Sequence, residues 1–271
     1  MTHKYNSQIN ARSLVKWDIV EGFKRIEIWS TLAWGEISAR YGRTIFGVFW
    51  NVISFAVFCV AIIVIFGAIP SAQAINFGPH VVVGFLIYSY IASLITDACG
   101  VFVQNQSWLK STRLPIGIFV YKGIMRNTII FGFNLLAAIA ILLIFYDLKL
   151  FVAQWLVVPA FFIILANSVA TYFLLGVVCA RFRDITHLII TLMRFSLFIT
   201  PIMWTAGGDG MRGKIAIINP FTHFIEIVRE PVLYGSMAFT SWMIILAFTA
   251  VLSLIAITVY VRVRKRFIYW L

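Results

Sequence analysis

The chain has 271 residues, of which 62% are hydrophobic and 12% are charged. A soluble domain is usually ~45–50% apolar and ~25% charged, so this composition leaves too few charged side chains to cover a soluble surface. Disorder is excluded too, because it requires low hydrophobicity and high charge density. We therefore expect a polytopic membrane protein, in which basic cytoplasmic loops explain the net charge of +12 better than nucleic-acid binding does.

The N-terminal segment, residues 1–43, is expected to be cytoplasmic and to contain an interfacial helix. It is too charged to hold the apolar core of a signal peptide. Its apolar residues recur at helical spacing, and its tryptophans suit the headgroup zone, which favours a helix lying on the membrane surface. A soluble helix packed on another subunit is the alternative. The apolar positions are Val15, Ile19, Phe23, Ile26, Ala33 and Ile37, and the tryptophans are Trp17, Trp29 and Trp34.

Charge-free apolar runs predict six membrane spans within residues 44–261. A span needs ~20 residues, so the longest run, from Thr44 to Thr96, must hold two spans separated by the turn formers of residues 70–79. Arg194 interrupts the fifth predicted span. The six predicted spans are residues 44–69, 80–102, 127–146, 150–180, 185–204 and 240–261.

The distribution of Lys and Arg predicts the orientation. Most of these residues precede the first span, follow the last, or lie in the loops between spans 2 and 3 and between spans 4 and 5. By the positive-inside rule, both termini are therefore expected in the cytoplasm, including the basic tail of residues 262–271. Cys59, Cys99 and Cys179 lie in or beside apolar runs without CxxC spacing, and we interpret them as buried hydrophobes.

One glycine-rich stretch resembles a phosphate-binding loop and fails in two respects. Gly208, Gly213 and Lys214 have the spacing GxxxxGK, but Ile215 replaces the Ser or Thr that would hold Mg²⁺. A predicted span, not a strand, precedes it. We interpret the stretch as a flexible exterior loop, and we expect no ATPase site, catalytic residue or bound cofactor in this chain.

A second pattern places three titratable side chains on one helical face. His223, Glu226 and Glu230 have the spacing i, i+3 and i+7, which a metal site or an acid–base pair would need. Structural metal sites usually have four ligands, and a local ion pair with Arg229 is the simpler alternative. We therefore expect no metal here.

Asp97 and Arg194 are the ionisable residues placed well inside predicted spans. A charge near the bilayer centre costs at least ~2.5–3.5 kcal/mol, so each should face protein or water and find a partner. Their estimated depths differ by less than one helical turn. We predict that they pair, within one subunit or across a dimer. The alternative is that Arg194 snorkels to the headgroups while Asp97 lies in a wet vestibule.

Several motifs together resemble the membrane subunit of ABC-2 type exporters, and most closely the polysaccharide branch that exports O-antigen, capsule and teichoic acid. The resemblance extends from about residue 15 to residue 265, and it departs from the family at Gly42, where many relatives carry another basic residue. The matching motifs are Arg40–Thr44 with Gly47 and Trp50, Lys110–Pro115, Arg181–Ile185, Pro201–Trp204, and Ile218–Phe221 followed by Glu226, Arg229 and Tyr234.

The resemblance implies an all-α integral membrane fold with six transmembrane helices, an N-terminal interfacial amphipathic helix and short exterior helices before the last span. It implies a homodimer that binds two cytoplasmic ABC ATPase subunits, which bind ATP and Mg, and that exports a lipid-linked polysaccharide across the bacterial inner membrane. The two cytoplasmic motifs supply the expected ATPase contacts, and the last motif supplies an exterior gate segment capping the pore. The expected contacts are Arg113, Pro115, Arg181, Arg183 and Asp184, and the gate residues are Asn219, Pro220, Glu226 and Arg229.

Aromatic residues near the span ends are candidates for the substrate path. The chain has 25 Phe, 10 Tyr and 9 Trp. Aromatic faces stack on the apolar faces of sugar rings, so Tyr88, Tyr90 and Trp204 are predicted to guide the glycan. An interfacial belt of aromatic residues is the alternative. Other functions left open are an ABC-2 exporter of drugs or small lipids, a membrane-embedded glycosyl transferase, and a channel.

Overall fold

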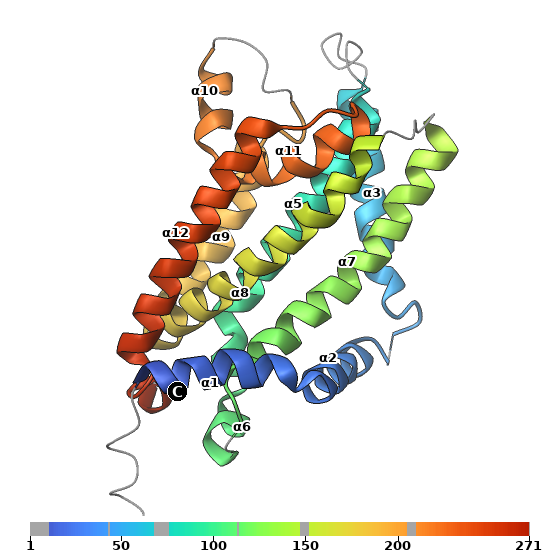
Figure 1. Ribbon diagram of the computed structural model, residues 1–271. Helices are drawn as coiled ribbons and strands as arrows, with labels where there is room; N and C mark the ends of the chain where they lie inside the picture. Colours follow the sequence, from blue (N-terminus) through green and yellow to red (C-terminus); the bar gives the residue numbers. More distant parts are fainter. Residues whose placement is uncertain are drawn as a thin grey trace, which may run out of the picture.

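The computed structural model describes residues 11–42, 44–67, 76–112, 114–146, 152–204 and 210–270. Regular structure in these ranges is helical throughout, and six long helices run side by side along one axis (Figure 1). The bundle consists of α3 (Phe49–Phe66), α5 (Phe77–Gln104), α7 (Gly117–Phe145), α8 (Val157–Arg181), α9 (Asp184–Ile199) and α12 (Phe239–Val263).

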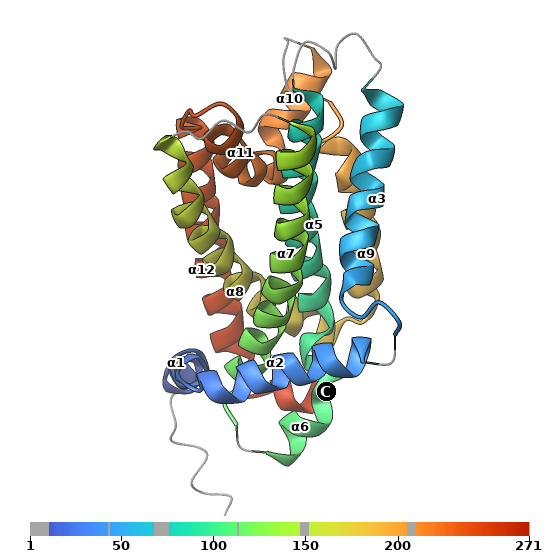
Figure 2. The same cartoon turned by 90° about the vertical axis from the view of Figure 1, so that its right-hand side faces the viewer.

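Shorter elements cover the two ends of the bundle (Figure 2). We call the end that carries α1 and α2 the basal end and the opposite end the distal end. The basal elements are α1 (Ala11–Lys24), α2 (Ile26–Tyr41), α6 (Gln106–Ser111) and η2 (Phe267–Trp270). The distal elements include α10 (Met211–Ile218) and α11 (Pro220–Leu233), and η1 (Val152–Leu156) leads into α8. Both ends of the described chain therefore lie at the basal end.

Within the described residues, five helices are long and apolar enough to cross a membrane. They are Phe49–Phe66, Phe77–Gln104, Gly117–Phe145, Ala153–Arg181 and Phe239–Val263. The fifth predicted span coincides with α9, which has 16 residues and is shorter than the ~20 residues that a span usually needs. The six-span count therefore stays a prediction.

α7 begins at Gly117, well before the predicted start at residue 127. Lys122 and Arg126, which the charge pattern assigned to a loop, lie inside this helix and are only 4% and 7% exposed. The prediction was wrong because it took Lys122 and Arg126 as the end of the loop before the third span. A buried base can lie within a helix when acids on neighbouring helices neutralise it, as they do here.

The N-terminal segment forms two helices instead of one. The break falls at Arg25, whose φ of −84° and ψ of 54° leave the helical region. Val15, Ala33 and Ile37 are buried, as their spacing predicted. Ile26, beside the break, is 52% exposed, so the predicted apolar stripe does not run continuously through the segment.

Buried contacts hold α1 against the base of the bundle. Asp18 is fully buried, forms an ion pair with Arg264 at the end of α12, and accepts hydrogen bonds from the Tyr260 hydroxyl at 2.8 Å and the Ile116 N–H at 3.0 Å. α1 also packs backbone to backbone on the start of α7. A Cβ added to Gly22 would lie 3.0 Å from the Gly117 Cα.

The distal elements begin with a helix where a flexible loop was expected. Gly208 lies outside the described residues, but Met211–Ile218 forms α10, so that expectation is wrong for this part. α11 then starts with a side-chain cap. The Asn219 side chain accepts the Phe221 N–H at 3.0 Å, and Pro220 occupies the first turn, where its missing N–H costs nothing.

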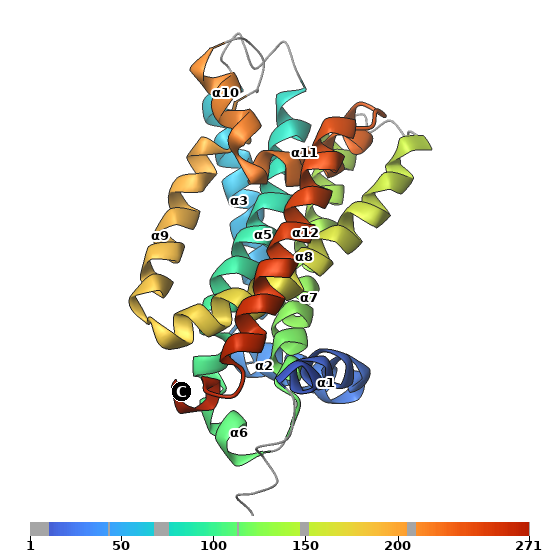
Figure 3. The same cartoon turned by 60° about the vertical axis from the view of Figure 1, so that its left-hand side comes forward.

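α5 is the central helix, and α9 is the outermost. α5 packs against α3, α7, α8, α9 and α11, and residues along its whole length are buried. Every residue of α9 is at least partly exposed, and the helix lies at the edge of the bundle (Figure 3). Only the C-cap residue after it, Thr200, is buried. Its apolar side chains include Leu192 and Phe195, which are 51% and 62% exposed.

Candidate functional site

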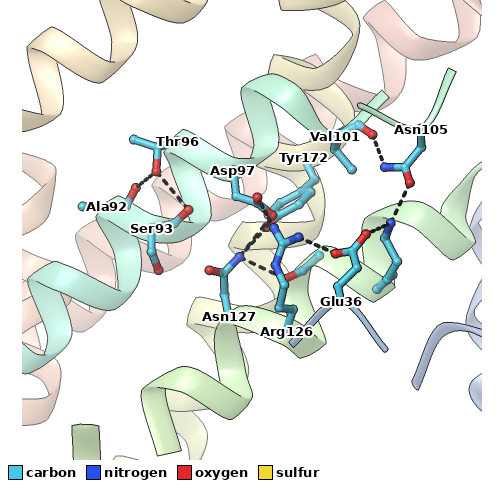
Figure 4. Close-up of polar contacts among 12 residues, drawn as sticks. Glu36, Ala92, Ser93, Thr96, Asp97, Val101, Asn105, Arg126, Asn127 and Tyr172 are labelled. Atoms are coloured by element: carbon cyan, nitrogen blue, oxygen red, sulfur yellow. Dashed lines mark hydrogen bonds and ion pairs between the residues drawn. The ribbon is translucent and has the colours of Figure 1, made fainter. Parts of the chain in front are cut away.

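The largest polar cluster in the described chain surrounds Asp97 on α5 (Figure 4). The Asp97 carboxylate forms an ion pair with Arg126 of α7. It also accepts the Tyr172 hydroxyl from α8 at 2.7 Å and the Asn127 side-chain amide at 3.2 Å. The same amide donates to the Tyr172 oxygen at 3.0 Å. Three helices therefore meet at one carboxylate.

The cluster continues to α2 through Glu36. This carboxylate forms ion pairs with both Arg126 and Lys122 of α7. The Lys122 ammonium also donates to the Asn105 side-chain oxygen at 2.6 Å, at the end of α5. We call these residues the basal network: Glu36, Asp97, Asn105, Lys122, Arg126, Asn127 and Tyr172. It links α2 directly to α7 and, through Lys122 and Arg126, to α5 and α8.

The basal network contains two acids and two bases, so its formal charge is zero. Burial alone would raise the pKa of Glu36, but Lys122 and Arg126 outweigh that effect and lower it, so the carboxylate stays ionised. Each base forms an ion pair with an acid on another helix. Breaking such a buried pair by removing one partner typically costs ~3–5 kcal/mol, because the remaining charge is left uncompensated.

The predicted pair of Asp97 and Arg194 within one subunit is wrong. Asp97 pairs with Arg126, and Arg194 is exposed on α9 without an ion pair to any residue that the structure describes. The prediction failed because it treated Arg126 as a loop residue. The spacing of Lys122, Arg126 and Asn127, at i, i+4 and i+5, was the available signal, because it places three polar groups on one side of a helix.

A second polar cluster lies at the distal end and is centred on Arg229 of α11. The buried Arg229 guanidinium donates to the Pro201 carbonyl oxygen at 2.8 Å and lies 3.0 Å from the His80 Nε2 on α5. These contacts join α11 to α5 and to the segment after α9. The local ion pair of Arg229 with Glu226 or Glu230 is not formed among the described residues, and the Glu230 carboxylate accepts the Ser236 hydroxyl at 2.7 Å.

His223 and Glu226 form the rest of the distal cluster. The His223 Nδ1 lies 2.9 Å from the Ser241 hydroxyl of α12, which in turn donates to the Glu226 carboxylate. The His223 Nε2 lies 2.8 Å from the Ile217 carbonyl oxygen. The Glu226 carboxylate, 3.7 Å from the His223 Nδ1, raises the pKa of His223. His223, Glu226 and Glu230 all lie in α11, but Glu230 bonds to Ser236 and does not join the other two.

The predicted path residues lie in different environments. Tyr88 and Tyr90 are buried on α5, where their hydroxyls lie 2.6 Å from the Ser196 hydroxyl and 2.8 Å from the Thr128 hydroxyl. Trp204 is half-buried and donates its indole N–H to the Phe198 carbonyl at 3.1 Å. Their role in guiding a substrate stays a prediction.

The predicted ATPase contacts gather at the basal end. Arg181, Arg183 and Asp184 are exposed in the turn between α8 and α9, and α6 lies at the same end (Figure 1). Pro115 is buried, and Arg113 lies outside the described residues. The Arg181 guanidinium lies 5.3 Å from the ring centre of Trp270, which connects the turn to the C-terminal residues.

Comparisons with known proteins match the chain over most of its length. It is 20% identical over 242 residues to an O-antigen export system permease protein RfbA of Klebsiella pneumoniae, which covers 86% of this chain and 90% of the relative. A second protein of that name and organism is 20% identical over 240 residues. An RfbA of Myxococcus xanthus is 20% identical over 194 residues, covering 68% of this chain and 72% of that protein. No family model matches the chain.

These comparisons confirm the resemblance to polysaccharide-exporting ABC-2 permeases that the motifs indicated. Together with the apolar helices, they identify a multi-pass membrane protein that resembles a transporter permease.

Proposed function

We propose that this chain is the membrane subunit of an ABC transporter that exports a lipid-linked polysaccharide across the bacterial inner membrane. The observation that carries the proposal is the match to O-antigen export permeases over 86% of the chain and 90% of the relative. The all-helical bundle with its apolar spans agrees with that role. A separate ATPase, which binds ATP and Mg, supplies the energy.

In the proposed topology, α9 completes six spans and both termini are cytoplasmic. The basal end then faces the cytoplasm, with α1 and α2 at the membrane surface, and α10 and α11 lie outside. The positive-inside rule supports this orientation, because exposed bases such as Lys16, Lys110, Arg181 and Arg262 lie at the basal end. The proposed domain limits remain 1–43, 44–261 and 262–271.

We assign the exposed apolar side chains of α9 to contact with a second copy of the chain. A helix of 16 residues at the edge of the bundle would gain burial and neighbours from a partner. A homodimer would also enclose Arg194, which stands exposed among Leu192 and Phe195. The pore would then run between the copies, with α11 and its residues Asn219 to Arg229 near its outer end.

Two ATPase subunits would dock on the basal end, at α6 and at the turn between α8 and α9. The proposed contacts are Arg113, Pro115, Arg181, Arg183 and Asp184. The basal network connects α2 to α7 through Glu36 and Arg126, and from there to α5 through Asp97. We assign it the task of transmitting ATPase movement to the bundle. Tyr88, Tyr90 and Trp204 keep their proposed role along the substrate path.

The enzyme alternative finds little support in the basal network. A membrane-embedded glycosyl transferase would need carboxylates free to exchange protons or bind a metal. Glu36 and Asp97 are each neutralised by bases, and Asp97 accepts two further hydrogen bonds. The names of the relatives favour polysaccharide over drugs or small lipids as the cargo.

Reconstitution with the cognate ATPase tests the proposal. The purified complex would be placed in inverted vesicles, and the uptake of lipid-linked glycans would be measured with and without ATP. We expect ATP-dependent accumulation of a glycan, and no accumulation with an ATPase that cannot hydrolyse ATP. ATP-driven transport of small lipids or drugs, but of no glycan, would contradict the assignment.

A further inference from the structure

An apolar groove lies between α8 and α12, directly beside α1. Its volume is about 180 Å³. Ala166 and Ala170 of α8 face Ser253 and Ala256 of α12 across it, and Ile19 of α1 closes its basal end. An apolar cavity of ~150 Å³ holds a molecule the size of benzene, so this groove has room for part of a hydrocarbon chain.

The position of the groove limits what can occupy it. In the proposed topology α8 and α12 both span the bilayer, which places the groove at the depth of the hydrocarbon. A transmembrane helix, with its ~10 Å diameter, is too wide to enter it. A lipid chain is flexible, apolar and narrow enough. The occupant that fits the groove is therefore an acyl chain.

Positive charge gathers at the foot of the groove. Lys16 lies one helical turn before Ile19, on the same side of α1, and is exposed. Lys265 and Arg266 are exposed just after α12 ends, and α1 packs against that helix (Figure 1). Neither these two bases nor Lys16 forms an ion pair with the residues that the structure describes.

The neighbouring acid does not neutralise these bases. Asp18 is fully buried and paired with Arg264. Glu21 pairs with Lys24 further along α1. The foot of the groove therefore keeps a net positive charge. Basic residues beside apolar grooves between membrane helices are a recognised setting for anionic lipid headgroups.

We propose that the groove between α8 and α12 binds one acyl chain of an anionic glycerophospholipid, whose phosphate is held by Lys16 and the two bases that follow α12. The bound lipid would lie over α1 and help to seat it on the bundle. This site is separate from the basal network and from the proposed substrate path.

Lipid binding to the purified full-length chain tests the site. Phosphatidylglycerol and phosphatidylcholine with identical acyl chains would be titrated separately, and bound lipid would be counted by native mass spectrometry. The charge variant is Lys16→Gln, and Lys214→Gln is its control, because Lys214 is an exposed base at the distal end. The groove-filling variant is Ala170→Leu, and Ala140→Leu adds the same bulk to an exposed face of α7.

We expect the wild type to prefer phosphatidylglycerol. A base near the membrane surface contributes ~1 kcal/mol, so Lys16→Gln should weaken phosphatidylglycerol binding about fivefold and leave phosphatidylcholine unchanged. Ala170→Leu should weaken the binding of both lipids, and the two control variants should bind both lipids as the wild type does.

Equal binding of both lipids by the wild type, or equal losses in the control variants, would overturn the proposal. Displacement of phosphatidylglycerol by a polyprenyl phosphate at equal or lower concentration would overturn it as well. That result would mean that the groove binds a polyprenyl phosphate and not a glycerophospholipid. Because transport is not measured, failure here leaves the proposed export function untouched.

Discussion

The basal and distal ends of the bundle hold their helices together by different means. At the basal end, acids and bases on different helices neutralise each other, as Glu36, Asp97 and Arg126 do. At the distal end, the guanidinium of Arg229 is held by the neutral Pro201 carbonyl and by His80. In the first arrangement, the loss of any one charge should strongly lower the free energy of unfolding, because its partner stays buried without a counter-charge. The second depends on single hydrogen bonds, and it lies on the same helix as His223, whose pKa is raised.

The largest effect is expected from Arg126→Met. This change leaves both Asp97 and Glu36 without their shared base, although Lys122 still faces Glu36. We expect the free energy of unfolding to fall by ~3–5 kcal/mol, measured by denaturant titration in detergent. Arg194→Met is the control, because that residue is exposed on α9. Equal losses of unfolding free energy in the two variants would mean that the buried ion pairs at the basal end do not stabilise the fold.

A smaller loss is expected from Asp18→Asn. Asparagine can accept the Ile116 N–H through its single side-chain oxygen and donate its amide to the Tyr260 oxygen, but it loses the ion pair with Arg264. Hydrogen bonds to charged groups contribute ~1.5–3 kcal/mol, and this loss should loosen α1. Trypsin should then cut faster at the exposed Lys16. Glu21→Gln removes only the exposed pair with Lys24, and cleavage of that variant should match the wild type.

The smallest effect is expected at the distal end, as a dependence on pH. Glu226 raises the pKa of His223, so the protonated imidazole contributes stability that is fully present below its ordinary pKa of ~6.5. That contribution is lost as the pH rises through the raised value. The melting temperature of the wild type should therefore exceed that of His223→Gln by more at pH 6 than at pH 8.5. A gap that widens with increasing pH would contradict this assignment.

Hydropathy predicted most of the bundle, because the apolar sequence of a membrane helix identifies it without any knowledge of its tertiary contacts. The predicted spans at 44–69, 80–102 and 240–261 contain, or nearly coincide with, α3, α5 and α12. The family motifs likewise indicated the kind of protein. The motif containing Asn219 and Pro220 falls on the start of α11, where the Asn219 side chain caps the helix.

The basal network was beyond this kind of prediction. Its partners are far apart in the chain, since Glu36, Asp97 and Arg126 belong to three helices, and only the packing brings them together. Assigning Lys122 and Arg126 to a loop also concealed their position inside α7. The break at Arg25 between α1 and α2 has no local marker such as Pro or Gly at that position. It depends on α1 and α2 each packing on α7.

In the proposed transporter, the basal network couples ATP hydrolysis to movement of the spans. The variant Glu36→Gln, studied in the complex with the ATPase, tests this coupling. Glutamine keeps the shape but loses the charge that binds Lys122 and Arg126. Hydrogen bonds to charged groups contribute ~1.5–3 kcal/mol, so we expect glycan export per ATP hydrolysed to fall roughly tenfold or more while hydrolysis continues. Glu27→Gln, at an exposed acid of the same helix, should export normally. If Glu36→Gln exports as much glycan per ATP as the wild type, the basal network does not couple hydrolysis to export.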